Sequence, residues 1–139
     1  MQNGCSIIDD VPGVYLILRC TEEPPVFLET GSGGRFKGID PNVPLSVLEE
    51  KWVEGTEIMY IGKAGTSLRK RIRTYMRFGE GAPAPHKGGR HIWQLADSRE
   101  LLVCWMLVAN TVDPEELEKS MIREFVKKFG KFPFANRRY

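Results

Sequence analysis

The chain has 139 residues, of which 42% are hydrophobic and 27% are charged, a balance typical of one globular domain rather than of a disordered or membrane protein. No apolar run reaches membrane-spanning length, and residues 1–13 lack the basic start and apolar stretch of a signal peptide. Cys5, Cys20 and Cys104 are odd in number and far apart, so we expect a reduced, cytoplasmic protein with no structural zinc and no membrane contact.

The net charge of +2 conceals an uneven distribution along the chain. Residues 1–57 hold four Lys or Arg against ten Asp or Glu, whereas residues 58–139 hold sixteen against eight. A basic stripe folded onto one face would favour an anionic partner such as nucleic acid. On charge alone, however, a solvated basic helix is the preferred interpretation.

Strands are predicted where β-branched and aromatic residues lie next to turn signals. Pro12-Gly13 precede a first strand over 14–18, and Gly62 closes a second over 57–61. A third run, 101–108, is apolar enough to predict a buried central strand.

Capping signals place the helices. Ser67 is the predicted N-cap of a basic amphipathic helix from Leu68 to about Phe78. Asp113 followed by Pro114 starts a last helix that runs to about Phe129 and is ended by Gly130. A short helical segment is also expected around 89–95. Strands alternating with helices predict an α/β fold of a small sheet with helices, in one domain over 1–139.

Residues 21–55, between the first two strands, are rich in Pro, Gly and acidic side chains. We expect them to form an insertion with little structure of its own apart from a short helix near 45–52.

Two helices direct polar side chains toward their apolar faces. Arg71 and Tyr75 are four residues apart and therefore project from one side of their helix. Glu118 shares an inward face with Ile122, and a carboxylate that faces a core needs a cation or a donor. Mg²⁺ would satisfy it, but a salt bridge to Arg71 or another basic side chain is the preferred interpretation of this pattern alone.

The other polar candidates carry weaker signals. Tyr15 and Tyr60 are strand tyrosines, which usually pack in a core, and Lys63 could reach a phosphate or stay solvated. His86 and His91 are candidates for acid-base or phosphate contacts, although surface or capping roles are more common for such residues.

Several short motifs, in one order along the chain, resemble the signatures of the GIY-YIG nucleases. Residues 13–15 (Gly-Val-Tyr) and 60–62 (Tyr-Ile-Gly) are similar to the paired motifs that name the family. The likeness continues through Lys63, the arginine helix at 68–75, the glutamate helix at 117–122 and Asn136. This ordered set covers almost the whole chain.

The resemblance implies a small three-stranded sheet, mixed or antiparallel, flanked by helices. It also implies hydrolysis of a DNA phosphodiester bond at a single-metal site with Mg²⁺ or Mn²⁺ bound by Glu118. Tyr15 or Tyr60 would act as general base, with the other tyrosine and Lys63 orienting the water or lowering its pKa. Arg71 would stabilise charge on the phosphoryl oxygens, and Tyr75 and Asn136 would support these groups. The basic side chains expected to contact DNA are Arg69, Lys70, Arg73, Arg77, Lys87 and Arg90.

Two departures from the family pattern matter. Tyr15 and Tyr60 are 45 positions apart rather than close in a hairpin, so the insertion must loop out to let their strands pair. The chain between Glu118 and Asn136 is also longer than the usual pattern.

Two rival functions fit the same residues: a nucleic-acid-binding or protein-interaction module that does not cut, and a metal-free phosphoesterase that uses His86 or His91. The sequence leaves the biological role open, and it leaves the oligomeric state open between monomer and homodimer.

Overall fold

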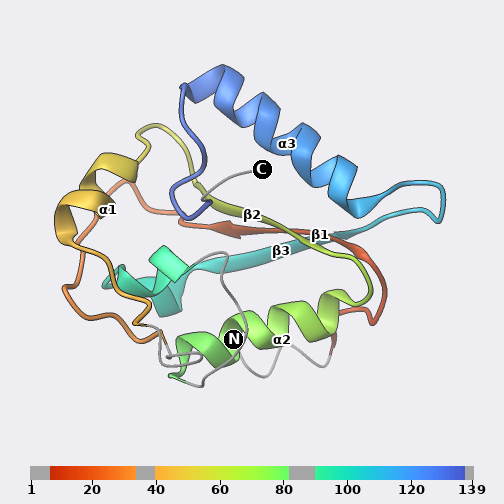
Figure 1. Cartoon of the computed structure of the whole chain (residues 1–139), viewed down its shortest axis with the longest axis horizontal. Coiled ribbons are helices and arrows are strands. Elements are labelled where there is room, and N and C mark those ends of the chain that lie inside the picture. Colours follow the sequence, from red (N-terminus) through yellow and green to blue (C-terminus); the bar gives the residue numbers. More distant parts are fainter. Residues whose placement is uncertain (1–6, 34–39, 82–89, 137–139) are drawn as a thin grey trace.

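The computed structural model describes residues 7–33, 40–81 and 90–136. Its centre is a three-stranded sheet of β1 (Gly13–Leu18), β2 (Ile58–Ala64) and β3 (Leu102–Leu107), in the order β2-β1-β3 (Figure 1). Both ladders are antiparallel, with Tyr15 opposite Gly62 on one side and opposite Trp105 on the other. The expected small sheet flanked by helices is confirmed, and all of its strands pair antiparallel.

β1 and β2 pair although a long segment separates them in sequence, as the resemblance required. This segment contains one described helix, α1 (Leu45–Lys51), as expected for the insertion. The buried side chain of Gln94, at the end of the 3₁₀ segment η2 (Arg90–Gln94), accepts from Val43 N at 2.9 Å and donates to the carbonyls of Leu28 and Val43. The insertion is therefore fastened to the body of the protein by a buried amide. A second 3₁₀ turn, η3 (Ser98–Glu100), leads into β3.

The two long helices cover opposite faces of the sheet (Figure 1). α2 (Leu68–Gly79) closes a core cluster that contains Tyr15 and Ile17. α3 (Pro114–Phe129) packs over Ile61 and its neighbours in a second, smaller cluster. Successive strand residues point to opposite faces, so neighbouring positions of β1 and β2 serve different cores. No described helix combines the length and the apolar character needed to cross a membrane.

Both long helices begin at the predicted signals, and α3 also ends at its predicted glycine. The Ser67 hydroxyl accepts from Lys70 N at the start of α2. Asp113 accepts from Glu115 N with Pro114 in the first turn of α3, and Gly130 ends that helix in the left-handed conformation at φ 75°.

The prediction that 101–108 forms a buried central strand is wrong. β3 is an edge strand, and Leu102 and Met106 are 54% and 51% exposed. β1 occupies the centre because it pairs with both other strands, and α3 lies over β2 and β1 rather than over β3. An apolar run shows that a strand can be buried but does not determine its position in the sheet.

Candidate active site

Two tyrosines from adjacent strands meet beneath α2. Tyr15 and Tyr60 both belong to the core cluster on this face, and their ring centroids lie 5.9 Å apart. Burial raises the pKa of Tyr15 well above its usual range and raises that of Tyr60 as well. The hydrogen bond between their hydroxyls raises the pKa of Tyr15 and lowers that of Tyr60, the pattern expected when Tyr15 donates and Tyr60 accepts.

Arg71 of α2 joins this pair from the side. Its guanidinium is hydrogen-bonded to Tyr60, and because arginine can only donate, the Tyr60 oxygen is the acceptor. The positive charge of Arg71 opposes the effect of burial on the pKa of both tyrosines. The deprotonated form of the Tyr60 hydroxyl is therefore better stabilised than that of the Tyr15 hydroxyl.

Glu118 of α3 approaches the same place from the other side of the sheet. This is sterically reasonable because β2 is an edge strand, so groups from both helices can meet around it. Glu118 is half-buried, and burial raises its pKa, while Lys63 and Arg71 act in the opposite direction. Its negative charge in turn raises the pKa of Tyr60. Tyr60, Arg71 and Glu118 thus form one electrostatically coupled group.

The salt bridge expected as the simpler partner for Glu118 is not found among the described residues. The ion pairs in this region join Glu115 to Lys63 at 3.2 Å and to Lys119 at 3.7 Å. Lys63 and Arg71 act on Glu118 electrostatically from beyond salt-bridge distance. The Glu118 carboxylate therefore keeps oxygen lone pairs for a ligand.

These residues fit a divalent cation shared with a phosphate. In the described parts of the chain no three His, Cys, Asp or Glu side chains group together, so an all-protein metal cage is not formed there. Mg²⁺ commonly takes one or two carboxylates and completes its coordination with phosphate and water. A half-buried carboxylate whose pKa is raised by burial gains from such a cation, and Glu118 is the residue that would hold it.

Lys63, Tyr75 and Asn136 lie around this group. Lys63 follows the second motif on β2 and is bonded to Glu115, so its charge is shared between that partner and Glu118. Tyr75 is fully buried, packs its ring 4.8 Å from that of Trp93, and is electrostatically coupled to Tyr60. The Asn136 amide accepts from Ile61 N at 2.9 Å and donates to Ile61 O at 3.0 Å. Asn136 thus fixes the backbone next to Tyr60.

The residues expected to contact DNA separate into three groups. Lys70, Arg73 and Arg77 are exposed on α2, as expected for contacts with a phosphate backbone. Arg69 instead donates to the carbonyl of Ile8 at 2.8 Å, and Arg90 is half-buried at the start of η2. Lys87 and His86 lie outside the described residues. His91 is buried, with its ring 6.2 Å from that of Phe134, so its role in acid-base chemistry stays a prediction.

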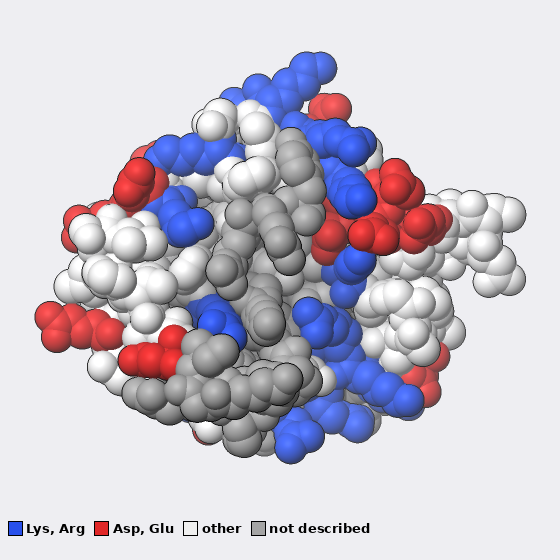
Figure 2. All heavy atoms as spheres, in the orientation of Figure 1, with Lys and Arg blue, Asp and Glu red and all other residues white. Residues whose placement is uncertain are grey.

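Basic side chains on α3 were not included among the expected DNA contacts. Figure 2 shows Lys and Arg over α3 and over α2 on the same face of the molecule, with acidic side chains between them near the start of α3. The signal for them was present in the sequence, because Lys119, Arg123 and Lys127 recur at every fourth position of this helix.

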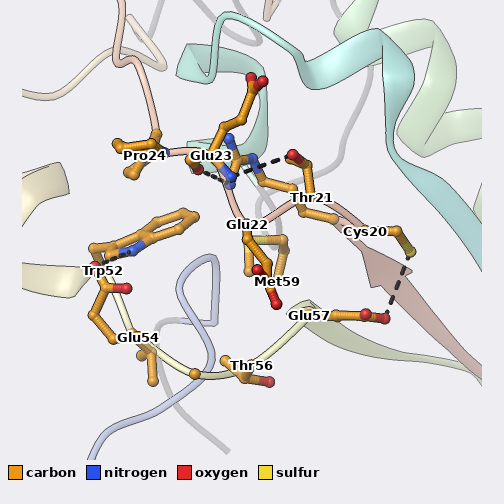
Figure 3. A pocket seen from close by; sticks show the side chains of 14 residues that line it. Cys20, Thr21, Glu22, Glu23, Pro24, Trp52, Glu54, Thr56, Glu57 and Met59 are labelled. Carbon is orange, nitrogen blue, oxygen red and sulfur yellow. Dashed lines mark hydrogen bonds between the residues drawn. The ribbon is translucent and has the colours of Figure 1, made fainter.

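A cavity of about 620 Å³ lies elsewhere, at the ends of β1 and β2 marked by Leu18 and Ile58. Figure 3 shows its lining, which includes Trp52 at one side and the carboxylates of Glu22, Glu23, Glu54 and Glu57. The Cys20 thiol donates to Glu57 at 3.6 Å, and burial together with this carboxylate raises its pKa. Acidic walls repel a phosphate, and a protonated thiol is a poor nucleophile, so this cavity does not fit the chemistry of the tyrosine site.

Comparisons with known proteins give one partial match. The chain is 31% identical over 77 residues to UvrABC system protein C of Nautilia profundicola, a match that covers 55% of this chain. It covers 12% of that relative, so this chain is similar to a small part of a much longer protein. No family model matches the chain. No solved structure matches it either.

Proposed function

We propose that this chain is a divalent-metal-dependent endonuclease of the GIY-YIG type, which hydrolyses phosphodiester bonds in DNA. The observation that carries the proposal is the position of Arg71, which is hydrogen-bonded to Tyr60 and electrostatically coupled to Tyr15 and Glu118. Four side chains from β1, β2, α2 and α3 therefore converge at the edge strand β2. The partial likeness to UvrABC system protein C adds support for a nuclease-related role.

The tyrosine pair supplies a base. The Tyr60 oxygen accepts from both Arg71 and Tyr15, and these two donors favour its deprotonated form. In this state Tyr60 takes a proton from a water molecule as the water oxygen attacks phosphorus and the bond to the leaving oxygen breaks. Tyr15 positions the Tyr60 oxygen and does not itself need to ionise.

Cationic side chains balance the charge that develops on the phosphate. Arg71 offers a planar, positively charged set of donors. A guanidinium beside the phosphoryl oxygens stabilises them most when their charge is greatest, at the transition state. Lys63 adds a second positive charge from β2, close enough to act on Glu118.

Glu118 would hold the metal ion. When bound, Mg²⁺ or Mn²⁺ supplies Lewis-acid polarisation of the phosphate and neutralises charge on the leaving oxygen. Glu115, which neighbours Glu118 on the same helix, is bonded to Lys63 and Lys119 and so is less suited to this task.

The test is nicking of supercoiled plasmid with Mg²⁺ or Mn²⁺ by the wild type, Arg71→Ala and Glu118→Gln. We expect each variant to lose at least about 100-fold in rate, since each lacks a group that stabilises the transition state. Arg99→Ala and Glu124→Gln are matched controls that remove an exposed cation from η3 and an exposed carboxylate from α3.

Four results would decide between the functions. Loss of nicking in the two site variants alone would support the nuclease. Equal nicking by all five proteins would indicate contamination and end the proposal. DNA binding without nicking by the wild type would favour the non-cutting module, and nicking that survives EDTA would favour metal-free chemistry.

A further inference from the structure

Three basic side chains form a stripe along α3. Lys119, Arg123 and Lys127 recur every four residues, so they project from one flank of the helix, turning by about 40° at each step. Glu115 stands at the head of the same stripe and is bonded to Lys63 of β2 at 3.2 Å. The Glu115 end of the stripe therefore lies beside the edge strand at which the tyrosines, Arg71 and Glu118 meet, and the stripe turns toward solvent from there to Lys127.

Lys119 is paired with Glu115 at 3.7 Å, and beyond this pair the stripe places like charges four residues apart, at 119 and 123 and at 123 and 127. Like charges four residues apart on a helix destabilise it by about 0.2–0.5 kcal/mol per pair. Other outward positions of α3 mix charge and polarity, as in Glu116, Ser120 and Glu124, whereas 119, 123 and 127 have a single sign. An anionic partner would offset this repulsion.

The dimensions of the stripe fit a phosphate backbone. Eight residues of helix separate Lys119 from Lys127, or about 12 Å, which is comparable with three to four nucleotide steps along one strand. α3 and α2 lie on opposite faces of the sheet, and both display Lys and Arg on the face seen in Figure 2. Two basic surfaces thus flank the acidic side chains at the start of α3.

We infer that Lys119, Arg123 and Lys127 bind the phosphate backbone of DNA on the side of the cleaved bond opposite to α2. The strand would then cross the edge of β2 between the two helices, held on both sides of the tyrosine pair. The placement of the cleaved bond rests on the proposed function, whereas the binding surface on α3 does not.

The test measures binding without cleavage. Fluorescence anisotropy of a labelled duplex of about 20 base pairs, in EDTA and over a range of salt, compares the wild type with the triple variant K119Q/R123Q/K127Q. A matched triple, K51Q/R99Q/K128Q, removes the same net charge from α1, η3 and a position of α3 outside the stripe. Circular dichroism and thermal unfolding establish that both triples are folded.

We expect the stripe variant to bind DNA at least about tenfold more weakly than the wild type. The slope of the logarithm of the binding constant against the logarithm of the salt concentration should also fall in magnitude by about two to three. The matched triple should stay within about threefold of the wild type. Equal weakening by the two triples, or unchanged binding by the stripe variant, would overturn the inference. If the wild type binds through this stripe but nicks no DNA with any metal, the proposed function fails while the binding surface stands.

Discussion

The ring of Tyr15 lies directly over Gly62 of the neighbouring strand. A Cβ built at position 62 would stand 2.4 Å from Tyr15 Cζ and 2.7 Å from its hydroxyl oxygen. The two residues are also partners in the β1–β2 ladder. The bare backbone at Gly62 therefore sets the depth at which the Tyr15 hydroxyl meets Tyr60, and a glycine is required there for space rather than for backbone conformation.

Gly62→Ala should displace the Tyr15 ring. We expect a loss of about 1–3 kcal/mol in the free energy of unfolding, measured by urea titration, because the added methyl overlaps a buried side chain. Plasmid nicking should fall at least about tenfold, since the Tyr15–Tyr60 hydrogen bond is disturbed. Gly65→Ala is the control, because a Cβ there meets nothing within 4 Å. Wild-type stability and nicking in Gly62→Ala would show that the ring is not held by this contact.

Asn136→Ala should loosen β2 beside the tyrosine pair. The substitution removes both hydrogen bonds to Ile61 and leaves a buried N–H and a buried carbonyl without partners. We expect a cost of about 2–4 kcal/mol in the free energy of unfolding and faster hydrogen exchange at the Ile61 amide. The exposed Asn110→Ala should change neither quantity. Unchanged protection of the Ile61 amide would contradict this role for Asn136.

Local signals explain why so much of the fold could be predicted. The capping serine at 67, the Asp113-Pro114 pair and Gly130 mark helix ends through contacts within a few residues, and the structure uses all three as expected. The spacing of Arg71 and Tyr75 also places both on the sheet side of α2 without any knowledge of the partner.

Relationships between distant segments could not be predicted in this way. The apolar character of β3 is compatible with a central or an edge position, and only the pairing of β1 with both neighbours decides between them. The bonds from Asn136 to Ile61 and from Gln94 to Val43 join residues 75 and 51 positions apart. The α3 stripe was visible in the sequence, but the packing of α3 determines which end of it lies beside β2.

The pH dependence of nicking should identify Tyr60 as the base. Burial raises the pKa of Tyr60, so at neutral pH little of it is deprotonated, and the single-turnover rate should rise with pH between about 6 and 9. Tyr60→Phe should lose at least about 100-fold, whereas Tyr15→Phe keeps the base and should lose less. A flat pH profile, or a greater loss in Tyr15→Phe than in Tyr60→Phe, would exclude this assignment.

Glu118→Gln should stabilise the protein while it abolishes nicking. Burial raises the pKa of Glu118 in the folded protein above its value in the unfolded chain. The protonated side chain therefore makes its full contribution to stability at pH values below the unfolded pKa, and this contribution is lost as pH rises through the folded pKa. At about pH 7 the ionised carboxylate therefore opposes folding, and the variant should show the higher free energy of unfolding in EDTA. The difference in the free energy of unfolding between the variant and the wild type should shrink toward about pH 4, because Glu118 becomes protonated and is then neutral like the glutamine. Glu124→Gln should show no such trend. A variant less stable than wild type at neutral pH would mean that Glu118 is paired within the protein and is not held ready for a cation.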